Sequence, residues 1–527
     1  MLLAAYCTLA QTPQPVTPAT DTTRTVIIRR ADKYGSKKLD SLYELRTVVG
    51  HVWFQDGNTM LYADSVVQNT KLNILEAFGN VRIDDNDSIH TRSQYLIYYI
   101  DKKVAVLKKN VSLTDNKGIL TTNELTYNTA LKTGTYVNGG KVVNGKTVLT
   151  SKEATYYAEL KDVYFKQNVK LRDPAYNLDT DSLLYNTQAK LATFITKTHI
   201  RDSSGSHIVT SEGFYNLENK TARFGKRATI VDKALTVVGD EVVTDDKSGQ
   251  FHATGNVVMI DTSQGLSVLA NDIKANRTNN TFIATQHPLM IIRQDNDSIY
   301  VAADTLFAGK LTDLAGYAAM VKKDTIKAPK VVNAKDTANR NRYFQAYRHV
   351  RIFTDSLQAV SDSLFYSGRD SIFQLFHDPI IWASNNQITG DTIYLYTKNK
   401  QAERMNVFEN GMLINKSDQN LFNQVKANTL NGYFKNGEFD FMHARGSAES
   451  VYYARDESNA IVGMNSATAD VIDMFFQKKE LHQVVYRNDV AGTMFPFRQI
   501  PEDKKLLRNF KWQESLRPKT KYELFGN

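Results

Sequence analysis

The chain has 527 residues, of which 42% are hydrophobic and 10% aromatic, so it can form a buried core and does not have the composition of a disordered protein. Lys and Arg number 65 against 56 Asp and Glu, but this formal charge of +9 is spread along the chain, which excludes the clustered basic surface of a nucleic-acid-binding protein. The single cysteine, Cys7, excludes a disulfide framework, a zinc finger and an iron–sulfur centre. At this length we expect several domains or an array of repeats.

The N-terminal residues indicate export. Residues 1–10 form a short apolar run that ends in small residues, and this pattern predicts a signal peptide cleaved after Ala10, with a true start that can lie further upstream. Lipid anchoring at Cys7 is an alternative that the bulky Tyr6 before it disfavours, and a disordered cytosolic N-terminus is another. We predict a flexible segment over 11–45.

A repeat of about thirty residues runs through most of the chain. Each copy has a strand with an acidic or amide residue, then a Tyr-rich strand, a polar turn and a strand ending in Asn-Val-x-apolar. The polar marker recurs once per copy at nearly even spacing, at Asp64, Gln94, Glu124, Glu153, Asp181, Glu212, Glu241, Asp272 and Asp304. Such regular spacing is typical of one supersecondary unit repeated many times.

Within each copy the apolar residues alternate with polar ones, as in Val81-Arg82-Ile83, which predicts β-strands rather than helices. The predicted fold class is therefore all-β: an elongated, solenoid-like array of repeats with no large helical domain. We expect a first block of repeats over 46–320, a degenerate repeat or linker over 321–342, and a second block over 343–495. The remaining basic and aromatic tail, 496–527, can dock on a partner or an anionic surface, or pack on the last repeat.

No pattern of catalytic or metal-ligating residues emerges. The ten histidines do not stand at metal-ligand spacings, and neither a phosphate-binding glycine loop nor a nucleophile elbow is present. We therefore predict no enzyme activity, no catalytic residue, no metal and no cofactor. The recurring Asp-Ser and Asp-Thr pairs are interpreted as turn caps, because a motif present in nearly every repeat is not a single active site.

The repeated strand resembles that of the OstA/LptA-like lipopolysaccharide-transport family. The residues that carry this resemblance are Phe78-Gly79-Asn80-Val81-Arg82-Ile83 and Thr254-Gly255-Asn256-Val257-Val258-Met259, together with the preceding Tyr62-Ala63-Asp64-Ser65. It is strong over about 45–320 and weaker over 343–495. The chain departs from the family in being far longer than the single-domain periplasmic member.

The resemblance implies an open β-jelly-roll whose two sheets enclose a groove for the acyl chains of lipopolysaccharide. It further implies a periplasmic location, edge strands that bind other lipopolysaccharide-transport proteins at the inner and outer membranes, and end-to-end self-association. One face of the strands would line the groove, and the candidates are Val81, Ile83, Val111, Leu113, Val169, Leu171, Val257, Met259, Val350 and Ile352. Each of them is equally well read as ordinary sandwich core.

Two other functions remain open. A structural or adhesive cell-surface β-solenoid without a lipid ligand would have a closed apolar core. A polysaccharide-acting enzyme on a β-helix would need paired carboxylates on neighbouring turns, and Asp64, Glu124 and Glu153 are the available candidates.

Overall fold

The computed structural model describes most of residues 27–525. Outside the described residues lie 1–26, 42, 86–88, 116, 204, 294–297, 315–340, 399–400, 419, 436–437, 459, 478–479 and 526–527. The predicted signal peptide, Cys7 and most of the 321–342 segment therefore fall outside them.

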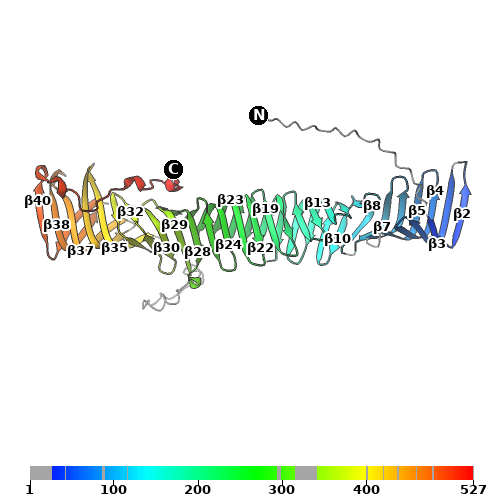
Figure 1. Ribbon diagram of the computed structural model, residues 1–527, viewed down its shortest axis with the longest axis horizontal. Coiled ribbons are helices and arrows are strands. Elements are labelled where there is room, and N and C mark those ends of the chain that lie inside the picture. Colours follow the sequence, from blue (N-terminus) through cyan, green and yellow to red (C-terminus); the bar gives the residue numbers. More distant parts are fainter. Residues whose placement is uncertain are drawn as a thin grey trace, which may run out of the picture. The chain divides into compact units, whose positions relative to one another are not determined.

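The chain divides into two compact units, residues 1–167 (unit 1) and 168–527 (unit 2), and their strands are drawn in Figure 1. The strands of unit 1 are β1 (Ile27–Arg30), β2 (Lys33–Lys38), β3 (Glu44–Asp56), β4 (Thr59–Asn69), β5 (Ile74–Asp85), β6 (Ile89–Tyr99), β7 (Val104–Thr114), β8 (Ile119–Asn128), β9 (Thr133–Tyr136), β10 (Gly140–Asn144), β11 (Thr147–Ser151) and β12 (Glu153–Tyr157). The unit boundary falls inside β13 (Asp162–Arg172).

Unit 2 has the same kind of strands. Its first part holds β14 (Tyr176–Asn186), β15 (Leu191–Phe194), β16 (Thr198–Asp202), β17 (His207–Thr210), β18 (Glu212–Asn216), β19 (Thr221–Gly225), β20 (Ala228–Asp232), β21 (Leu235–Gly239), β22 (Glu241–Asp245), β23 (Gln250–Asp261), β24 (Leu266–Asn276), β25 (Thr281–Thr285), β26 (Leu289–Arg293), β27 (Ser298–Ala302) and β28 (Thr305–Lys310). Its second part holds β29 (Arg342–Phe353), β30 (Leu357–Ser367), β31 (Ile372–Phe376), β32 (Ile380–Ala383), β33 (Asn386–Thr389), β34 (Thr392–Lys398), β35 (Gln401–Asp418), β36 (Leu421–Lys435), β37 (Glu438–Arg455), β38 (Ile461–Gln477), β39 (Glu480–Arg487) and β40 (Ala491–Pro496).

The predicted all-β repeat architecture, a β-jelly-roll type of fold, is confirmed. Among the described residues the helical segments are five short 3₁₀ turns: η1 (Leu311–Asp313), η2 (Phe497–Gln499), η3 (Glu502–Lys504), η4 (Glu514–Leu516) and η5 (Lys521–Phe525). The described helices include none long and apolar enough to cross a membrane. β1 and β2 lie within the segment expected to be flexible. β28 pairs directly with β29, so the sheet is continuous inside unit 2 across the segment expected to be a degenerate repeat or linker.

Sharp corners divide the long strands into two arms. The β5–β6 pairing shifts register between Phe78 and Val81, where Gly79 and Asn80 both have positive φ, +71° and 43°. Two consecutive left-handed residues bend the strand, and a glycine adopts this backbone without strain. The amide of Asn80 also donates to Asp64 Oδ2 at 3.0 Å, so this marker carboxylate holds the corner of the next strand.

Equivalent corners recur at Lys109–Asn110 in unit 1 and at Gly255–Asn256 and Glu409–Asn410 in unit 2. We call arm A the strand halves joined by tight turns such as 70–73 and 100–103, and arm B the other halves. The inner faces of the two arms carry the core, so polar and apolar residues alternate along the strands as predicted.

The core of each unit is built from rows of side chains that face each other across neighbouring strands. In arm B of unit 1, Leu61 lies opposite Ile83, Thr91 lies opposite both Ile83 and Leu113, and Leu120 lies opposite Leu113. Side chains that face each other at this spacing, here four apolar residues and Thr91, are the pairs that stabilise an antiparallel sheet.

The C-terminal segment, residues 497–525, packs on the outer face of arm B in unit 2. Figure 1 shows it, in red, running back from β38 towards β29. Leu524 is buried with Leu289 and Ala302, and the rings of Phe510 and Phe422 lie 5.2 Å apart. Both faces of arm B are therefore covered here, which explains why all four residues of β32 are buried.

Candidate functional site

Unit 1 has a cavity of about 530 Å³ where the free ends of its two arms meet, and we call it the mouth pocket. It is lined by Phe54, Asp56, Gly57, Asn58, Thr59, Leu61, Leu75, Ile83, Asp85, Leu96, Tyr98, Lys103, Ala105, Thr129, Ala130 and Lys132. Both arms contribute, because 54–61 and 83–85 belong to arm B and 96–105 and 129–132 to arm A.

The mouth pocket has a mixed lining, with apolar side chains between the arms and polar or charged side chains at the strand ends. Its inner wall includes Phe54, Leu75 and Leu96, whose side chains are buried between the arms. The rim residues sit at the strand ends, where each strand stops at a polar turn. An apolar interior with a few polar groups at the opening is the general form of a ligand pocket, and it suits an amphiphile with its apolar chain inside.

Next to this pocket the arms are tied together by Tyr156 and Asp115. The Tyr156 hydroxyl, on arm A, donates to Asp115 Oδ2 at the end of arm B at 2.8 Å. Burial raises the pKa of Tyr156, and the Asp115 carboxylate adds to this effect. Burial also raises the pKa of Asp115, but hydrogen bonds from the Gly118 amide and from Tyr156 outweigh this effect, so the pKa of Asp115 is lowered.

A similar arrangement recurs one repeat earlier and again in unit 2. Tyr127 is the counterpart of Tyr156 in the preceding repeat, and burial followed by the nearby Asp85 carboxylate raises its pKa. In unit 2 the Tyr176 hydroxyl donates to Asp246, and burial together with this bond raises the pKa of Tyr176. Tyr156–Asp115 in unit 1 and Tyr176–Asp246 in unit 2 are therefore hydrogen-bonded between the arms of their unit. The buried Tyr127 hydroxyl has no hydrogen-bond partner among the described residues.

The mouth pocket lies beside Tyr98, the next tyrosine of this series towards the N-terminus. Tyr98, the counterpart of Tyr127 one repeat earlier, has its hydroxyl 3.5 Å from Thr129 Oγ1 on the same arm. The carboxylate opposite, Asp56, has a buried Oδ1 for which the described residues offer no hydrogen-bond partner.

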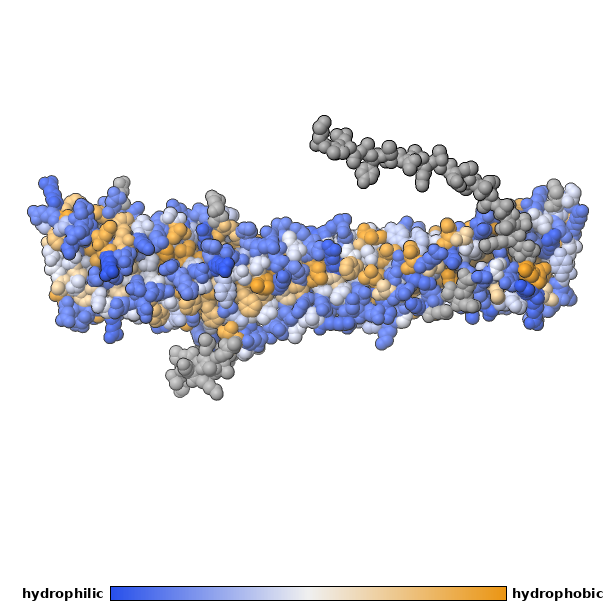
Figure 2. Space-filling view, in the orientation of Figure 1, coloured by the Kyte–Doolittle hydropathy of each residue, from blue (hydrophilic) through white to orange (hydrophobic). Residues whose placement is uncertain are grey.

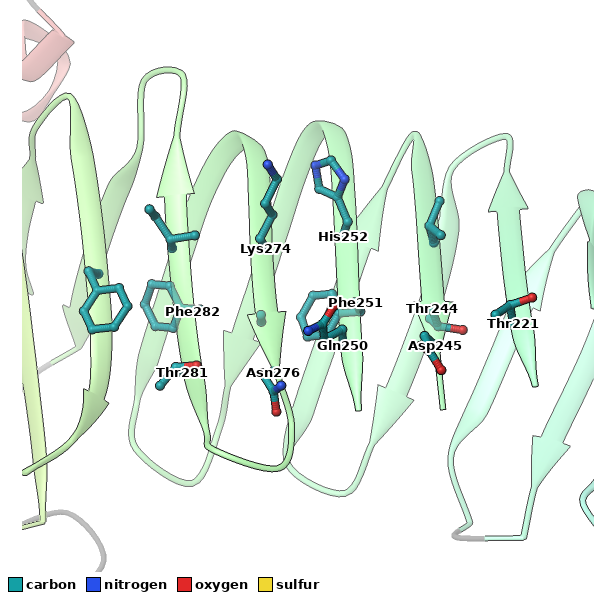
Figure 3. Close-up of a pocket in the computed structure, with 14 residues that line it drawn as sticks. Thr221, Thr244, Asp245, Gln250, Phe251, His252, Lys274, Asn276, Thr281 and Phe282 are labelled. Atoms are coloured by element: carbon teal, nitrogen blue, oxygen red, sulfur yellow. The ribbon is translucent and has the colours of Figure 1, made fainter. Parts of the chain in front are cut away.

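A second depression, of about 540 Å³, lies on the outer face of arm A in unit 2 (Figure 3). Residues on neighbouring strands form its floor and walls; Val243 lies opposite His252, and Lys274 lies opposite both His252 and Ile283. His252 Nε2 is 2.6 Å from Asp272 Oδ2. Val243 and Ile283 are about 40% exposed, so this is a shallow surface trough rather than an interior groove.

Figure 2 shows the visible face of unit 2, where polar residues predominate along the two long edges and apolar residues are interspersed between them. The strand turns lie at these edges. Outer-face residues of unit 2 such as Tyr347 and Phe408 are partly exposed.

All ten groove candidates are buried on the inner faces of the arms, with exposed fractions between 0% and 7%. Val81, Ile83, Val111, Leu113, Val169, Leu171, Val257, Met259, Val350 and Ile352 make up this set. Ile83 and Leu113 share one cross-strand row, and Met259 and Ile352 share another through Val268, Met290 and Val301. Of the ten, Ile83 lines the mouth pocket. Burial of this kind fits both a groove wall and ordinary core, so their role as lipid contacts stays a prediction.

The marker carboxylates proposed as an alternative catalytic set are engaged in separate pairs. Asp64 accepts from Asn80, Glu124 lies 3.5 Å from Lys108 Nζ, and Glu153 accepts from Gln167 Nε2 at 3.0 Å. Across the described residues no group of three or more His, Cys, Asp or Glu side chains is placed to hold a metal ion.

Sequence reasoning missed the rim of the mouth pocket, although a periodic signal was present. The tyrosines at 98, 127 and 156 recur once per repeat, and so do the aspartates at 56, 85 and 115. Both series consist of polar residues near strand ends, whereas the groove candidates were chosen as apolar residues on the inner faces of strands.

The fold and the mouth pocket define a class: a β-jelly-roll repeat protein with a cavity between its arms. Residues 23–181 match the model of the OstA-like protein family, so the predicted resemblance to this family is confirmed over a segment that contains the whole mouth pocket.

Among solved structures, the chain is similar to LptH from Pseudomonas aeruginosa, described as the LptA-homologous periplasmic component of the lipopolysaccharide transport device. The two are 11% identical over 27% of this chain and 82% of that one, with a TM-score of 0.20. No curated protein matches the chain.

Proposed function

We propose that this protein is an exported, periplasmic lipid carrier of the OstA type that shields lipopolysaccharide acyl chains between the two arms of its β-jelly-roll during their transfer to the outer membrane. The observation that carries the proposal is the mouth pocket, a cavity inside the family-matched segment that combines apolar side chains between the arms with charged residues at its edge. Export rests on the sequence pattern of residues 1–10.

The physics of transfer supports a carrier without catalytic residues. Exposing an acyl chain of about twelve carbons to water costs roughly 10 kcal/mol at ~0.8 kcal/mol per methylene. An apolar path between the arms removes this cost without breaking any bond. Shielding of this kind requires burial and shape rather than an acid, a base or a metal.

The proposal includes a bridging role through edge strands. In unit 1, β2 pairs with β3 and is exposed along its length, and in unit 2, β40 pairs with β38 and is mostly exposed. Strand edges of this kind can add a strand from a partner, which would be another lipopolysaccharide-transport protein or a second copy.

The test is to purify the chain from an envelope that contains lipopolysaccharide, wash it at high salt, and identify retained lipid by mass spectrometry. Salt screens attachment by charge, so retained lipid is held by its acyl chains. Ile83→Trp should fill the mouth pocket and reduce the retained lipid. Ile119→Trp is the matched control, because Ile119 is 50% exposed.

Lipid-free protein from such an envelope would contradict the proposal. It would favour the structural or adhesive β-solenoid, which has a closed apolar core. The burial of the other nine groove candidates is consistent with such a core, because they line neither the mouth pocket nor the surface trough. If both tryptophan variants retain equal amounts of lipid, the lipid does not bind in the mouth pocket. Thermal unfolding of both variants checks that each one folds.

A further inference from the structure

Five successive tight turns of arm A carry a lysine in the left-handed backbone conformation. These residues and their φ angles are Lys103 (53°), Lys132 (50°), Lys161 (59°), Lys190 (50°) and Lys220 (61°). They recur once per repeat along the sequence. Neighbouring repeats have Asn73, Gly249 and Asn280 at this turn position, also with positive φ.

Backbone hydrogen bonds explain why this turn position is left-handed, but they do not explain why a lysine occupies it. The carbonyl of Lys103 accepts from Thr129 N at 2.9 Å, and that of Lys132 accepts from Ala158 N at 3.1 Å, so each turn is tied to the next. Glycine and asparagine adopt this conformation with the least strain, whereas a lysine is strained there. The turn geometry by itself therefore does not require a lysine.

In unit 1, two of these lysines line the mouth pocket. Lys132 Nζ is 3.8 Å from Glu159, a long contact at an exposed site, and Lys103 makes no ion pair within the described part of the chain. Opposite them on arm B are Asp85 and Asp56, and the buried Oδ1 of Asp56 lacks a hydrogen-bond partner among the described residues. One side of the pocket thus carries two lysines, and the other carries two carboxylates, one of which has a buried oxygen without a hydrogen-bond partner among the described residues.

We propose that Lys103 and Lys132 bind a phosphate on the head of an amphiphile whose acyl chain enters the mouth pocket, while Asp56 accepts a hydrogen bond from a hydroxyl of the same head. This inference rests on the proposed function and adds a headgroup site to it. Ammonium groups bind phosphate as point charges, and carboxylates are acceptors for hydroxyl donors. The ligand class is a phosphorylated, hydroxylated lipid.

The experiment compares the full chain with its Lys103→Asn/Lys132→Asn variant. Asparagine suits the left-handed position, so this variant loses two charges without backbone strain, and its thermal stability should equal or exceed that of the wild type. Lys102→Asn/Lys141→Asn is the control, because it changes the net charge equally at exposed residues that do not line the pocket. The probes are bisphosphorylated lipid A and its dephosphorylated form, with inorganic phosphate as competitor.

We expect the Lys103→Asn/Lys132→Asn variant to bind phosphorylated lipid A at least about tenfold more weakly, with little change for the dephosphorylated lipid, since a hydrogen bond to a charged group carries energy of this order. The control should bind both lipids as the wild type does. An equal loss for both lipids, no loss for either, or displacement of lipid A by inorganic phosphate at low concentration would overturn the headgroup site. Wild-type protein that binds neither lipid would instead overturn the proposed function.

Discussion

Gln387 and Gln513 are joined by a hydrogen bond from the Gln513 backbone amide to Gln387 Oε1 at 2.7 Å, and Gln387 Nε2 donates to the carbonyl of Lys511 at 2.7 Å. The buried side-chain amide thus pairs with the C-terminal segment as a neighbouring strand would. Gln424 repeats this pairing with the Lys505 carbonyl and the Leu507 amide, each at 2.8 Å.

Arg517 extends the series. It donates from Nη2 to Gln358 Oε1 at 2.7 Å, and Gln358 is buried on β30. The C-terminal segment is therefore held by three buried glutamines on successive parts of arm B. It is an integral layer of unit 2 and not a solvated tail.

Replacing Gln387 by leucine should release the middle of this segment. Gln387→Leu leaves the Lys511 carbonyl and the Gln513 amide without partners, and the expected cost is about 1–3 kcal/mol of unfolding free energy. Trypsin should then cleave after Arg508 or Lys511 much faster than in the wild type. Gln401→Leu, at an exposed glutamine, is the control, and equal cleavage rates in both variants would contradict the pairing.

Removing the Tyr156 hydroxyl should weaken the tie between the arms of unit 1. Tyr156→Phe loses the hydrogen bond to the Asp115 carboxylate, and a bond to a charged group contributes about 1.5–3 kcal/mol. Denaturant unfolding measures this loss. The neighbouring Tyr157 is 38% exposed, so Tyr157→Phe should change stability by less than about 0.5 kcal/mol; equal effects at the two positions would show that Tyr156 does not tie the arms.

Stability should fall steeply in alkali. Burial raises the pKa of Tyr127, Tyr156, Tyr176 and Tyr215 above the ordinary value of 10.0, so the folded state favours their neutral forms. Their stabilising contribution is complete below pH 10.0 and is lost as pH rises towards their folded pKa values.

Ultraviolet titration of phenolate absorbance checks this expectation. In the native protein some of the 27 tyrosines should ionise only together with unfolding, and in denaturant all should titrate near their ordinary pKa. A single native transition that includes every tyrosine near pH 10.0 would rule out the buried set.

A side chain at Gly79 should destabilise a corner of unit 1. Gly79 has φ of +71°, and a β-carbon there would overlap the carboxylate of Asp64, so Gly79→Ala should cost about 1–3 kcal/mol. Gly35 has nothing within 4 Å of an added β-carbon and no positive φ, so Gly35→Ala is the matched control. Similar thermal unfolding of the two variants would contradict the role of Gly79.

The repeat period, the all-β class and the inward-facing rows could be predicted from the sequence because they depend on local patterns. Val81 and Ile83 alternate with Arg82, and this alternation places both on the inner face of any strand in this register. The buried run Ile380-Ile381-Trp382-Ala383 breaks the alternation, which was a readable sign that both faces of arm B are covered.

The candidate site depended on contacts that the sequence does not specify locally. Asp115 and Tyr156 are 41 residues apart, and Gln387 and Gln513 are 126 apart. Both pairings arise only when the arms face each other and the C-terminal segment folds back. Sequence alone determined the strand pattern, since side-chain alternation is a property of neighbouring residues. Tertiary structure decided which strand ends meet, because closing so long a loop costs conformational entropy that only packing between distant parts of the chain offsets.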